Sequence, residues 1–265
     1  SRNFQLEIQN NTAGKWRQGL PCLLSEQEFD ALMLTLVDQV YTKLRARNPQ
    51  CTHLLDKHPN YSKHLPLIDR LLPQSRFIHI IRDGREVAVS MMSVRKRVGH
   101  SPGEVRGAAR EWYRCLTMAR ADGERLGPQR YMEVRYENLM KDTATELDRV
   151  LKFCDLPVDT AFVDRISKEH HISVRQVSKG DTTLNALRAK PGAIWREKMS
   201  VSERWIFDQM VGGLLNQLGY AEPGWWATSA SDRMRMLPYG FGVRLKRSLE
   251  PIGRAWSGPL EEKLA

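Results

Sequence analysis

The sequence has few cysteines and no cysteine motif. Its four cysteines lie far apart, with no C-x-x-C pair, so the common zinc and redox motifs are excluded. Cys51 and Cys154 stand among apolar residues, and we expect them to be core thiols rather than disulfide partners. Free thiols favour a reducing compartment. We therefore predict a cytoplasmic protein, or a Golgi-luminal one if a membrane anchor precedes Ser1.

Long apolar runs and glycine-rich phosphate loops are missing as well. No stretch approaches the ~20 apolar residues of a membrane helix, and no signal peptide is visible. Nothing fits the Walker pattern G-x-x-x-x-G-K-[ST], since Gly14-Lys15-Trp16 fails it, and no G-x-G-x-x-G follows an expected strand. The cradle that most nucleotide-binding enzymes use is therefore absent from these residues.

Positive charge is abundant. Lys and Arg number 41 against 31 Asp and Glu, which gives a formal net charge of +10. Such an excess suits anionic partners, including nucleotides, nucleic acids, sulfated or phosphorylated sugars and membrane surfaces, although a solvated basic surface explains it equally well. An apolar fraction of 41% is enough for a core. A globular, folded chain is expected.

The periodicity predicts an α/β fold. Short apolar runs at 51–55, 76–81 and 130–136 indicate strands, and apolar residues at helical spacing lie before, between and after them. Ser25 with Glu28 and Ser101 with Glu104 form expected capping boxes, the second with Pro102 at the first helical position. Alternating strands and helices predict a parallel sheet flanked by helices. We expect one domain over 1–220 and a basic extension over 221–265.

In such sheets, ligands bind beyond the carboxyl ends of the strands. The second expected strand ends on Arg82, and a buried guanidinium there needs an anionic partner. Ser90 follows two helical turns later, and Arg95 adds positive charge, so the three side chains are candidates for one phosphate group. The alternative is that Arg82 pairs with Asp83 or another carboxylate and that Ser90 faces the helix surface.

Four ordered segments resemble the sulfotransferases that use 3′-phosphoadenosine 5′-phosphosulfate (PAPS), above all the bacterial and tyrosylprotein branches. They are "LLDKHPNYSKHLPLIDRLLPQSRFIHIIRDGREVAVSMMSVRK", "VRYENLMKD", "LKFCDLPVD" and "GAIWREKMS". The resemblance implies a three-layer, P-loop NTPase-like sulfotransferase fold. It implies that Arg82 and Ser90 hold the 3′-phosphate and that Tyr136 lies by the adenine. It further implies that Trp195 and Arg196 close over the nucleotide.

The same resemblance implies an activity. Lys57 answers to the family's catalytic lysine, which stabilises charge on the departing nucleotide. Sulfuryl transfer from PAPS to a hydroxyl of a sugar, phenol, lipid or tyrosyl peptide is expected, without a metal.

The family's Pro-x-Ser-Gly-Thr-Thr-like phosphosulfate loop is not in this sequence, and we expect it upstream of Ser1, so that the fold is N-terminally incomplete. A non-catalytic nucleotide- or polyanion-binding relative is the alternative, and a nucleic-acid-binding protein is a weaker one, because no recognition motif is present. The basic piece Arg244–Trp256 is expected on the outside of the fold, against an anionic acceptor or membrane. The sequence carries no readable code for the acceptor or for the oligomeric state.

Overall fold

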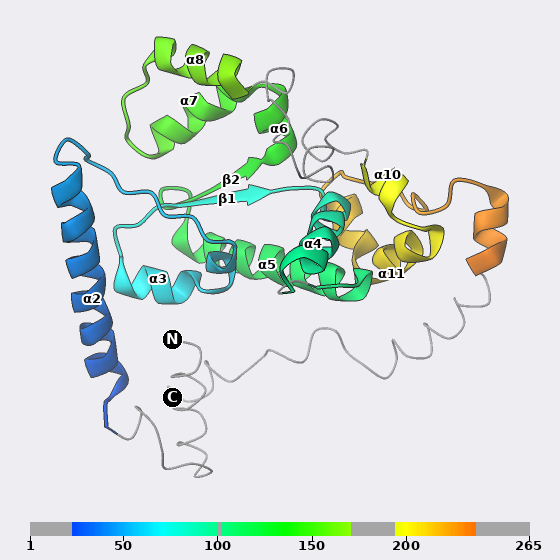
Figure 1. The fold of residues 1–265 in the computed structure, drawn as a ribbon, viewed down its shortest axis with the longest axis horizontal. Helices are drawn as coiled ribbons and strands as arrows, with labels where there is room; N and C mark the ends of the chain where they lie inside the picture. The colour runs from blue at the N-terminus through cyan, green and yellow to red at the C-terminus, as the bar shows by residue number, and fades with distance from the viewer. Residues whose placement is uncertain (1–22, 100–101, 171–193, 237–265) are drawn as a thin grey trace. The chain divides into compact units, whose positions relative to one another are not determined.

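A computed structural model describes residues 23–99, 102–170 and 194–236 (Figure 1). Arg244–Trp256 lies outside these residues, so its expected place on the outside of the fold stays a prediction. The elements follow one another in this order: α2 (Glu26–Arg47), the 3₁₀-helix η2 (Pro59–Lys63), α3 (Leu65–Leu71), β1 (Phe77–Ile81), α4 (Gly84–Val98), α5 (Val105–Leu126), β2 (Tyr131–Arg135), α6 (Tyr136–Lys141), α7 (Thr143–Phe153), α8 (Thr160–His170), α10 (Ile194–Lys198) and α11 (Val201–Gln217).

The chain forms two compact units. The first comprises Ser1–Phe77 with Met118–Tyr131, and the second comprises Ile78–Thr117 with Met132–Ala265. Helix α5 is continuous and contributes its first part to the second unit and its last part to the first.

The first unit contains α2 and α3. The expected capping box of α2 is confirmed, because Ser25 Oγ accepts the Glu28 N–H at 3.2 Å and Glu28 Oε2 accepts the Ser25 N–H at 2.8 Å. Arg70 of α3 contacts Glu26 at 2.7 Å and Asp30 at 2.6 Å. These contacts lie at the surface, where ion pairs stabilise a fold by less than about 1 kcal/mol. They orient the two helices more than they hold the unit together.

The predicted strand at 51–55 is wrong. Residues 51–58 are exposed and have no regular secondary structure. Leu55 is 90% exposed, and Cys51, expected in the core, is exposed as well, whereas Cys154 is partly buried. A strand is stable only beside another strand that takes up its N–H and C=O groups, and in the described part of the chain β1 and β2 pair only with each other. Apolar composition alone does not supply that neighbour.

Two helix boundaries also differ from prediction. The helix expected over 61–72 is divided into η2 and α3, and Pro66 lies in the first turn of α3, where its missing N–H costs nothing. Helix α5 begins at Val105, so Pro102 precedes the helix instead of opening it. Because Glu104 and not Ser101 directly precedes α5, the predicted capping box with Ser101 as the N-cap is wrong.

The second unit confirms the α/β class. The parallel strands β1 and β2 pair in one sheet, and the chain between them forms α4 and α5. In Figure 1, α7 and α8 lie on one side of the strands and α4 on the other. Both strands pass directly into helices, α4 and α6, so the residues at these two junctions share the carboxyl edge of the sheet.

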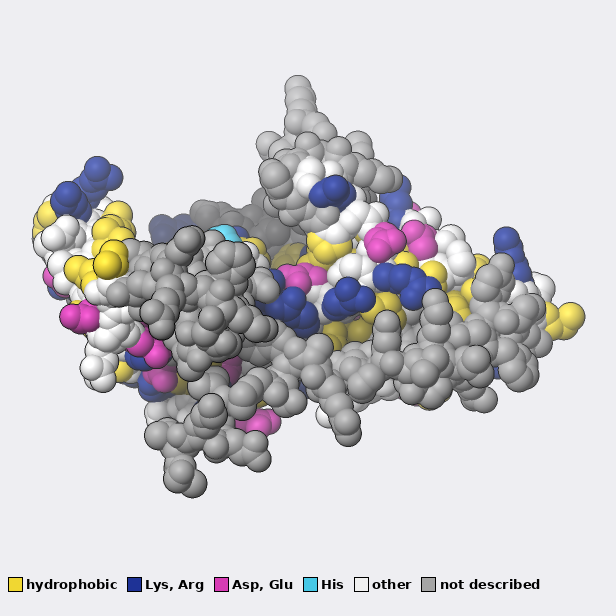
Figure 2. Space-filling view, turned by 90° about the horizontal axis from the view of Figure 1, so that it is seen from below, with side chains coloured by type: hydrophobic (Ala, Val, Ile, Leu, Met, Phe, Trp, Pro, Cys, Tyr) yellow, Lys and Arg dark blue, Asp and Glu magenta, His cyan; other side chains and the backbone are white. Residues whose placement is uncertain are grey.

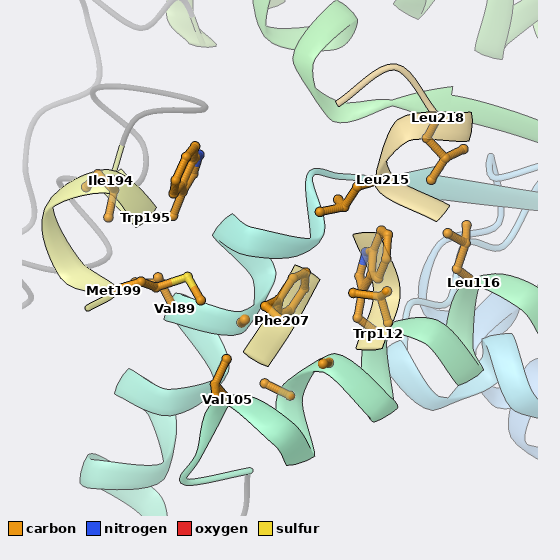
Figure 3. Packing of buried hydrophobic residues seen from close by; sticks show 14 of the residues in the cluster. Val89, Val105, Trp112, Leu116, Ile194, Trp195, Met199, Phe207, Leu215 and Leu218 are labelled. Carbon is orange, nitrogen blue, oxygen red and sulfur yellow. The ribbon is translucent and has the colours of Figure 1, made fainter. Parts of the chain in front are cut away.

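The core of the second unit packs α4, the first part of α5, α10 and α11 together (Figure 3). Phe207 is fully buried, and its ring centroid lies 6.1 Å from that of Trp112. Burying a phenylalanine side chain stabilises a fold by about 1.5–3 kcal/mol. Ala88, Ala108 and Ala109 are fully buried too, and their small side chains let α4 and α5 approach closely. This core fixes the beginning of α4, where Arg82 is expected to act.

Among the described residues, no helix is long and apolar enough to span a membrane. Lys and Arg side chains group together on the face shown in Figure 2, with apolar side chains beside them. Part of the positive charge counted in the sequence is therefore concentrated on one described surface.

Candidate functional site at the carboxyl edge of the sheet

Two of the predicted nucleotide-binding residues meet at this edge. Arg82 directly follows β1, and Tyr136 is the first residue after β2. The guanidinium carbon of Arg82 lies 4.4 Å from the centroid of the Tyr136 ring, which is close enough for a cation–π contact. The Arg82 side chain is 21% exposed, so this cation is held by the fold and is still reached by solvent.

Arg82, Glu86 and Ser90 form a row along α4. Residues four apart are neighbours on a helix surface, and these three follow one another at that spacing. Arg82 NH2 lies 3.4 Å from Glu86 Oε2, and Glu86 is fully buried. Ser90, one turn further along, is partly buried. The spacing thus places Glu86 and Ser90 on one face of α4, and Arg82, two residues before the helix, pairs with Glu86, a carboxylate that the sequence did not indicate.

The turn between β1 and α4 is fixed by α5. The Asp83 side chain accepts the Arg85 N–H at 2.9 Å, which confirms it as the N-cap of α4. Trp112 Nε1 donates a hydrogen bond to the Arg82 carbonyl oxygen at 3.2 Å. A Cβ at Gly84 would lie 2.6 Å from the Trp112 ring, so only glycine fits there without displacing the tryptophan. The position of the Arg82 backbone therefore depends on Trp112.

Arg85, the second arginine of the turn, holds the fold together. Its Nε and NH2 groups bind both oxygens of Asp83, and its NH2 also donates to the Tyr220 carbonyl. The guanidinium lies against two aromatic rings that also contact each other, 4.2 Å from the centroid of Trp195 and 4.7 Å from that of Trp225. Its side chain is only 6% exposed. Asp83 therefore pairs with Arg85, and the carboxylate that pairs with Arg82 is Glu86, as the alternative with another carboxylate allowed.

Glu137 joins the ends of the two strands. One of its oxygens accepts the Asp83 N–H at 2.9 Å and the other accepts the Tyr220 hydroxyl at 3.0 Å. Burial, followed by the nearby Glu137 charge, raises the pKa of Tyr220 well above its ordinary value. Tyr220 is thus a neutral hydrogen-bond donor at physiological pH. This contact fixes the beginning of α6 and, with it, the Tyr136 ring.

Trp195 and Arg196 lie on α10. Trp195 is 1% exposed and belongs to the core, and its indole N–H has no hydrogen-bond partner in the described structure. Direct contact between Trp195 and a nucleotide, which the sequence predicts, therefore requires α10 to move. Arg196 is exposed, and its guanidinium lies 4.4 Å from the Trp195 ring centroid. Between the two, Arg196 is the side chain that a ligand can reach.

Two predicted residues stand apart from this row. Arg95, near the end of α4, is exposed, and its guanidinium contacts the Gly99 carbonyl where the helix ends. A cation near the last carbonyls of a helix is a favourable end contact, so Arg95 already has a structural role. Lys57 lies in the exposed segment 51–58 of the first unit. Its predicted catalytic role stays a prediction.

The immediate surroundings of Lys57 contain two local hydrogen bonds. The Tyr61 hydroxyl donates to Asp56, and the His58 ring accepts the Asn60 N–H at 3.2 Å as the cap of η2. The hydrogen bond to Asp56 raises the pKa of Tyr61 to about 12. The Tyr61 hydroxyl therefore stays protonated across the physiological pH range and can donate to Asp56, the residue before Lys57.

The sequence analysis missed Glu86 and Tyr220 as contributors to the edge. One signal was available, because Glu86 stands four residues after Arg82, the spacing of a helical ion pair. Nothing indicated that Tyr220, 83 residues after Glu137, would contact it.

Comparison with known proteins identifies the family. Residues 5–160, more than half of the chain, match the profile of the Sulfotransferase family. A Caenorhabditis elegans protein named provisionally as a protein-tyrosine sulfotransferase is 26% identical over 74% of this chain and 75% of its own length. Protein-tyrosine sulfotransferase 2 of Gallus gallus is 22% identical over 76% of this chain and 52% of its own.

One further relative and one solved structure are also similar to this chain. The omega-hydroxy-beta-dihydromenaquinone-9 sulfotransferase of Mycobacterium tuberculosis is 24% identical over 71% of this chain and 45% of its own length. This chain therefore spans about half the length of several curated relatives. The solved sulfotransferase domain of the Synechococcus olefin synthase superposes with a TM-score of 0.46 at 21% identity, over 70% of this chain and 64% of that one. The match over residues 5–160 is what decides the assignment: this chain belongs to the sulfotransferase family.

Proposed function

We propose that the protein transfers a sulfuryl group from PAPS to a hydroxyl acceptor. Membership of the sulfotransferase family supports sulfuryl transfer in general. The donor, the acceptor and the residue roles are our proposal. The observation that carries it is the row of Arg82, Glu86 and Ser90 at the carboxyl edge of the sheet, with Arg82 over the Tyr136 ring.

The row fits a phosphate group. An arginine fork binds phosphate through two parallel N–H donors, and a serine hydroxyl adds a third. The N-terminus of α4, a helix of 15 residues, begins beside Arg82 and favours negative charge. The aromatic ring of Tyr136 supplies a flat apolar surface of the kind on which a nucleobase stacks. We therefore assign the 3′-phosphate to Arg82 and Ser90 and the adenine to the neighbourhood of Tyr136, with Arg196 closing over the nucleotide.

The proposed chemistry is a single displacement at sulfur. The acceptor oxygen attacks the sulfur, a new S–O bond forms, and the bond from sulfur to the 5′-phosphate oxygen breaks. The acceptor proton leaves to a base or to water, and the negative charge that develops on the phosphate oxygen is stabilised by the Lys57 ammonium. As in phosphoryl transfer, positioning and charge stabilisation account for most of such catalysis.

Two named relatives favour a hydroxyl acceptor. One is named for protein tyrosine, which carries a phenol, and the other for an omega-hydroxylated dihydromenaquinone. A hydroxyl group is what these acceptors share. We propose a hydroxyl acceptor for this protein too.

The decisive experiment compares two nucleotides. Isothermal titration calorimetry should show that adenosine 3′,5′-bisphosphate binds more tightly than adenosine 5′-monophosphate by about 2–3 kcal/mol, the scale of charge-assisted hydrogen bonds. That difference corresponds to about 30- to 150-fold in affinity. Equal affinities would refute the 3′-phosphate site. Transfer of labelled sulfate from PAPS to a panel of phenols, lipids, sugars and tyrosyl peptides then identifies the acceptor class.

A further inference from the structure

Glu86 is a fully buried carboxylate with two well-defined contacts. Its Oε2 atom lies 3.4 Å from Arg82 NH2, and its Oε1 atom accepts the Trp195 backbone N–H at 3.2 Å. Glutamates are almost never fully buried unless they are paired, because an ionised carboxylate loses its hydration. Burial correspondingly raises the pKa of Glu86. Burying this carboxylate costs folding free energy, so we ask what its two contacts do.

The carboxylate approaches Arg82 from the protein side. Glu86 has no exposed surface, while the Arg82 side chain is 21% exposed. The Tyr136 ring contacts the guanidinium as well. The geometry therefore lets Glu86 hold the guanidinium from the core while an anion approaches from solvent.

The second oxygen of Glu86 holds a different element. By accepting the Trp195 N–H, it fixes the beginning of α10, which carries the exposed Arg196. Helix α10 is only five residues long, and an isolated helix of that length is not stable on its own. One carboxylate thus links the two cationic side chains that we assign to the nucleotide.

We propose that Glu86 is a positioning residue that sets Arg82 for the 3′-phosphate and couples it to α10. The inference rests on the proposed function. An unrestrained arginine side chain loses conformational entropy when it binds a ligand. An arginine that Glu86 already holds loses less. The opposite effect, competition between the carboxylate and the phosphate for the guanidinium, is the weaker one here because the two approach from different sides.

The test is Glu86→Gln, with Glu146→Gln as its control. The amide still accepts the Trp195 N–H through its oxygen, but it no longer carries the charge that pairs with Arg82. Glu146 is also buried and pairs with an arginine, Arg149, on α7. Calorimetry should show an affinity for adenosine 3′,5′-bisphosphate that is about tenfold lower in Glu86→Gln. Affinity for adenosine 5′-monophosphate should change less than about twofold, and Glu146→Gln should leave both affinities unchanged.

Selectivity for the 3′-phosphate separates positioning from a merely structural role. An equal loss with both nucleotides, no loss, or a gain in bisphosphate affinity would each overturn the proposal, the gain because it would reveal competition. If the wild-type protein does not discriminate between the nucleotides, the proposed function fails and this inference fails with it. If the wild type discriminates and Glu86→Gln discriminates equally, only the inference fails.

A second measurement needs no variant. In wild-type protein, hydrogen–deuterium exchange of residues 194–198 should slow when adenosine 3′,5′-bisphosphate binds, and it should slow much less with adenosine 5′-monophosphate. Coupling of α10 to Arg82 through Glu86 predicts this difference. Identical exchange with both nucleotides at saturation would refute the coupling.

Discussion

The turn after β1 and the segment 51–58 are built in opposite ways. In the turn, Asp83, Arg85 and Glu86 are all buried and have charged or backbone partners from other elements. In 51–58 every residue is exposed, and hydrogen bonds there join near neighbours such as Asp56 and Tyr61. The two regions belong to different compact units.

The comparison shows which contacts hold the proposed binding and catalytic side chains in position. The fold holds Arg82 in position, because Trp112 contacts its backbone and Glu86 and Tyr136 contact its side chain. Lys57 has no comparable support in its segment. Substitutions in the turn should therefore affect stability and nucleotide binding together, whereas substitutions in 51–58 should affect activity without affecting stability.

The largest expected effect is on turnover. Lys57→Ala should lower kcat for sulfate transfer by about 100- to 1,000-fold, the range seen when one electrostatic stabiliser of a transition state is removed. The melting temperature and the affinity for adenosine 3′,5′-bisphosphate should stay nearly unchanged, because the lysine is exposed. Lys152→Ala, an exposed lysine of α7 paired with Asp148, is the control. Unaltered kcat would remove Lys57 from the mechanism.

The next effect is on nucleotide affinity. Arg82→Ala should weaken binding of adenosine 3′,5′-bisphosphate by about 2–3 kcal/mol and leave adenosine 5′-monophosphate nearly unaffected. Arg149→Ala, at a half-exposed arginine that pairs with a buried glutamate, controls for loss of an ion pair. Calorimetry with both nucleotides measures these affinities. A similar loss in the two variants would show that Arg82 stabilises the fold and does not bind phosphate.

Gly84→Ala should destabilise the fold. The added Cβ meets the Trp112 ring at 2.6 Å, and overpacking of this kind costs about 1–3 kcal/mol in unfolding free energy. Gly213→Ala is the matched control, because a Cβ there meets nothing within 4 Å and α11 should gain about 0.5–1 kcal/mol. Urea denaturation of the two variants measures both values. Equal stabilities would mean that Trp112 moves aside easily.

The stability contributed by Glu86 should depend on pH. Burial raises its pKa above the ordinary value of 4.5, so the folded state binds the proton more tightly than the unfolded state does. Stability must then fall as pH rises through a window that opens near 4.5 and extends upward. The unfolding free energy of the wild type relative to Glu86→Gln should decrease across that window in urea titrations. An increase would show that the ion pair with Arg82 outweighs burial.

Local signals predicted much of the fold. A capping box, helical periodicity and the apolar runs at 76–81 and 130–136 correctly predicted α2, α4, α5, β1 and β2, because these features act within a few residues. The run at 51–55 shows the limit, since a strand depends on a neighbour that the run itself does not specify. The same limit explains Trp195, whose burial depends on Arg85 and Trp225.

Of the candidate site, the sequence located Arg82 and Tyr136 through their positions after strands. The structure brings these two together. The sequence could not locate the residues that support the site, because contacts such as that of Glu137 with Tyr220 join residues far apart in the chain. Supporting residues carry no motif of their own, and only the folded geometry reveals them.

The smallest expected effect belongs to the open segment. Tyr61→Phe removes the hydroxyl that donates to Asp56, but the pair is exposed, and water replaces a lost surface hydrogen bond. We expect a loss of less than about 0.5 kcal/mol in unfolding free energy, the usual limit for surface substitutions. Affinity for adenosine 3′,5′-bisphosphate should not change.

That small loss should also have a characteristic pH dependence. The hydrogen bond to Asp56 raises the pKa of Tyr61 from 10.0 to about 12, so the folded state favours the neutral phenol. The advantage of wild type over Tyr61→Phe is therefore complete below pH 10 and disappears as the pH rises toward 12. Urea titrations at pH 8 and at higher pH, with Tyr113→Phe as an exposed-tyrosine control, measure it. A Tyr61→Phe loss as large as that of Gly84→Ala would show that 51–58 is built as firmly as the turn.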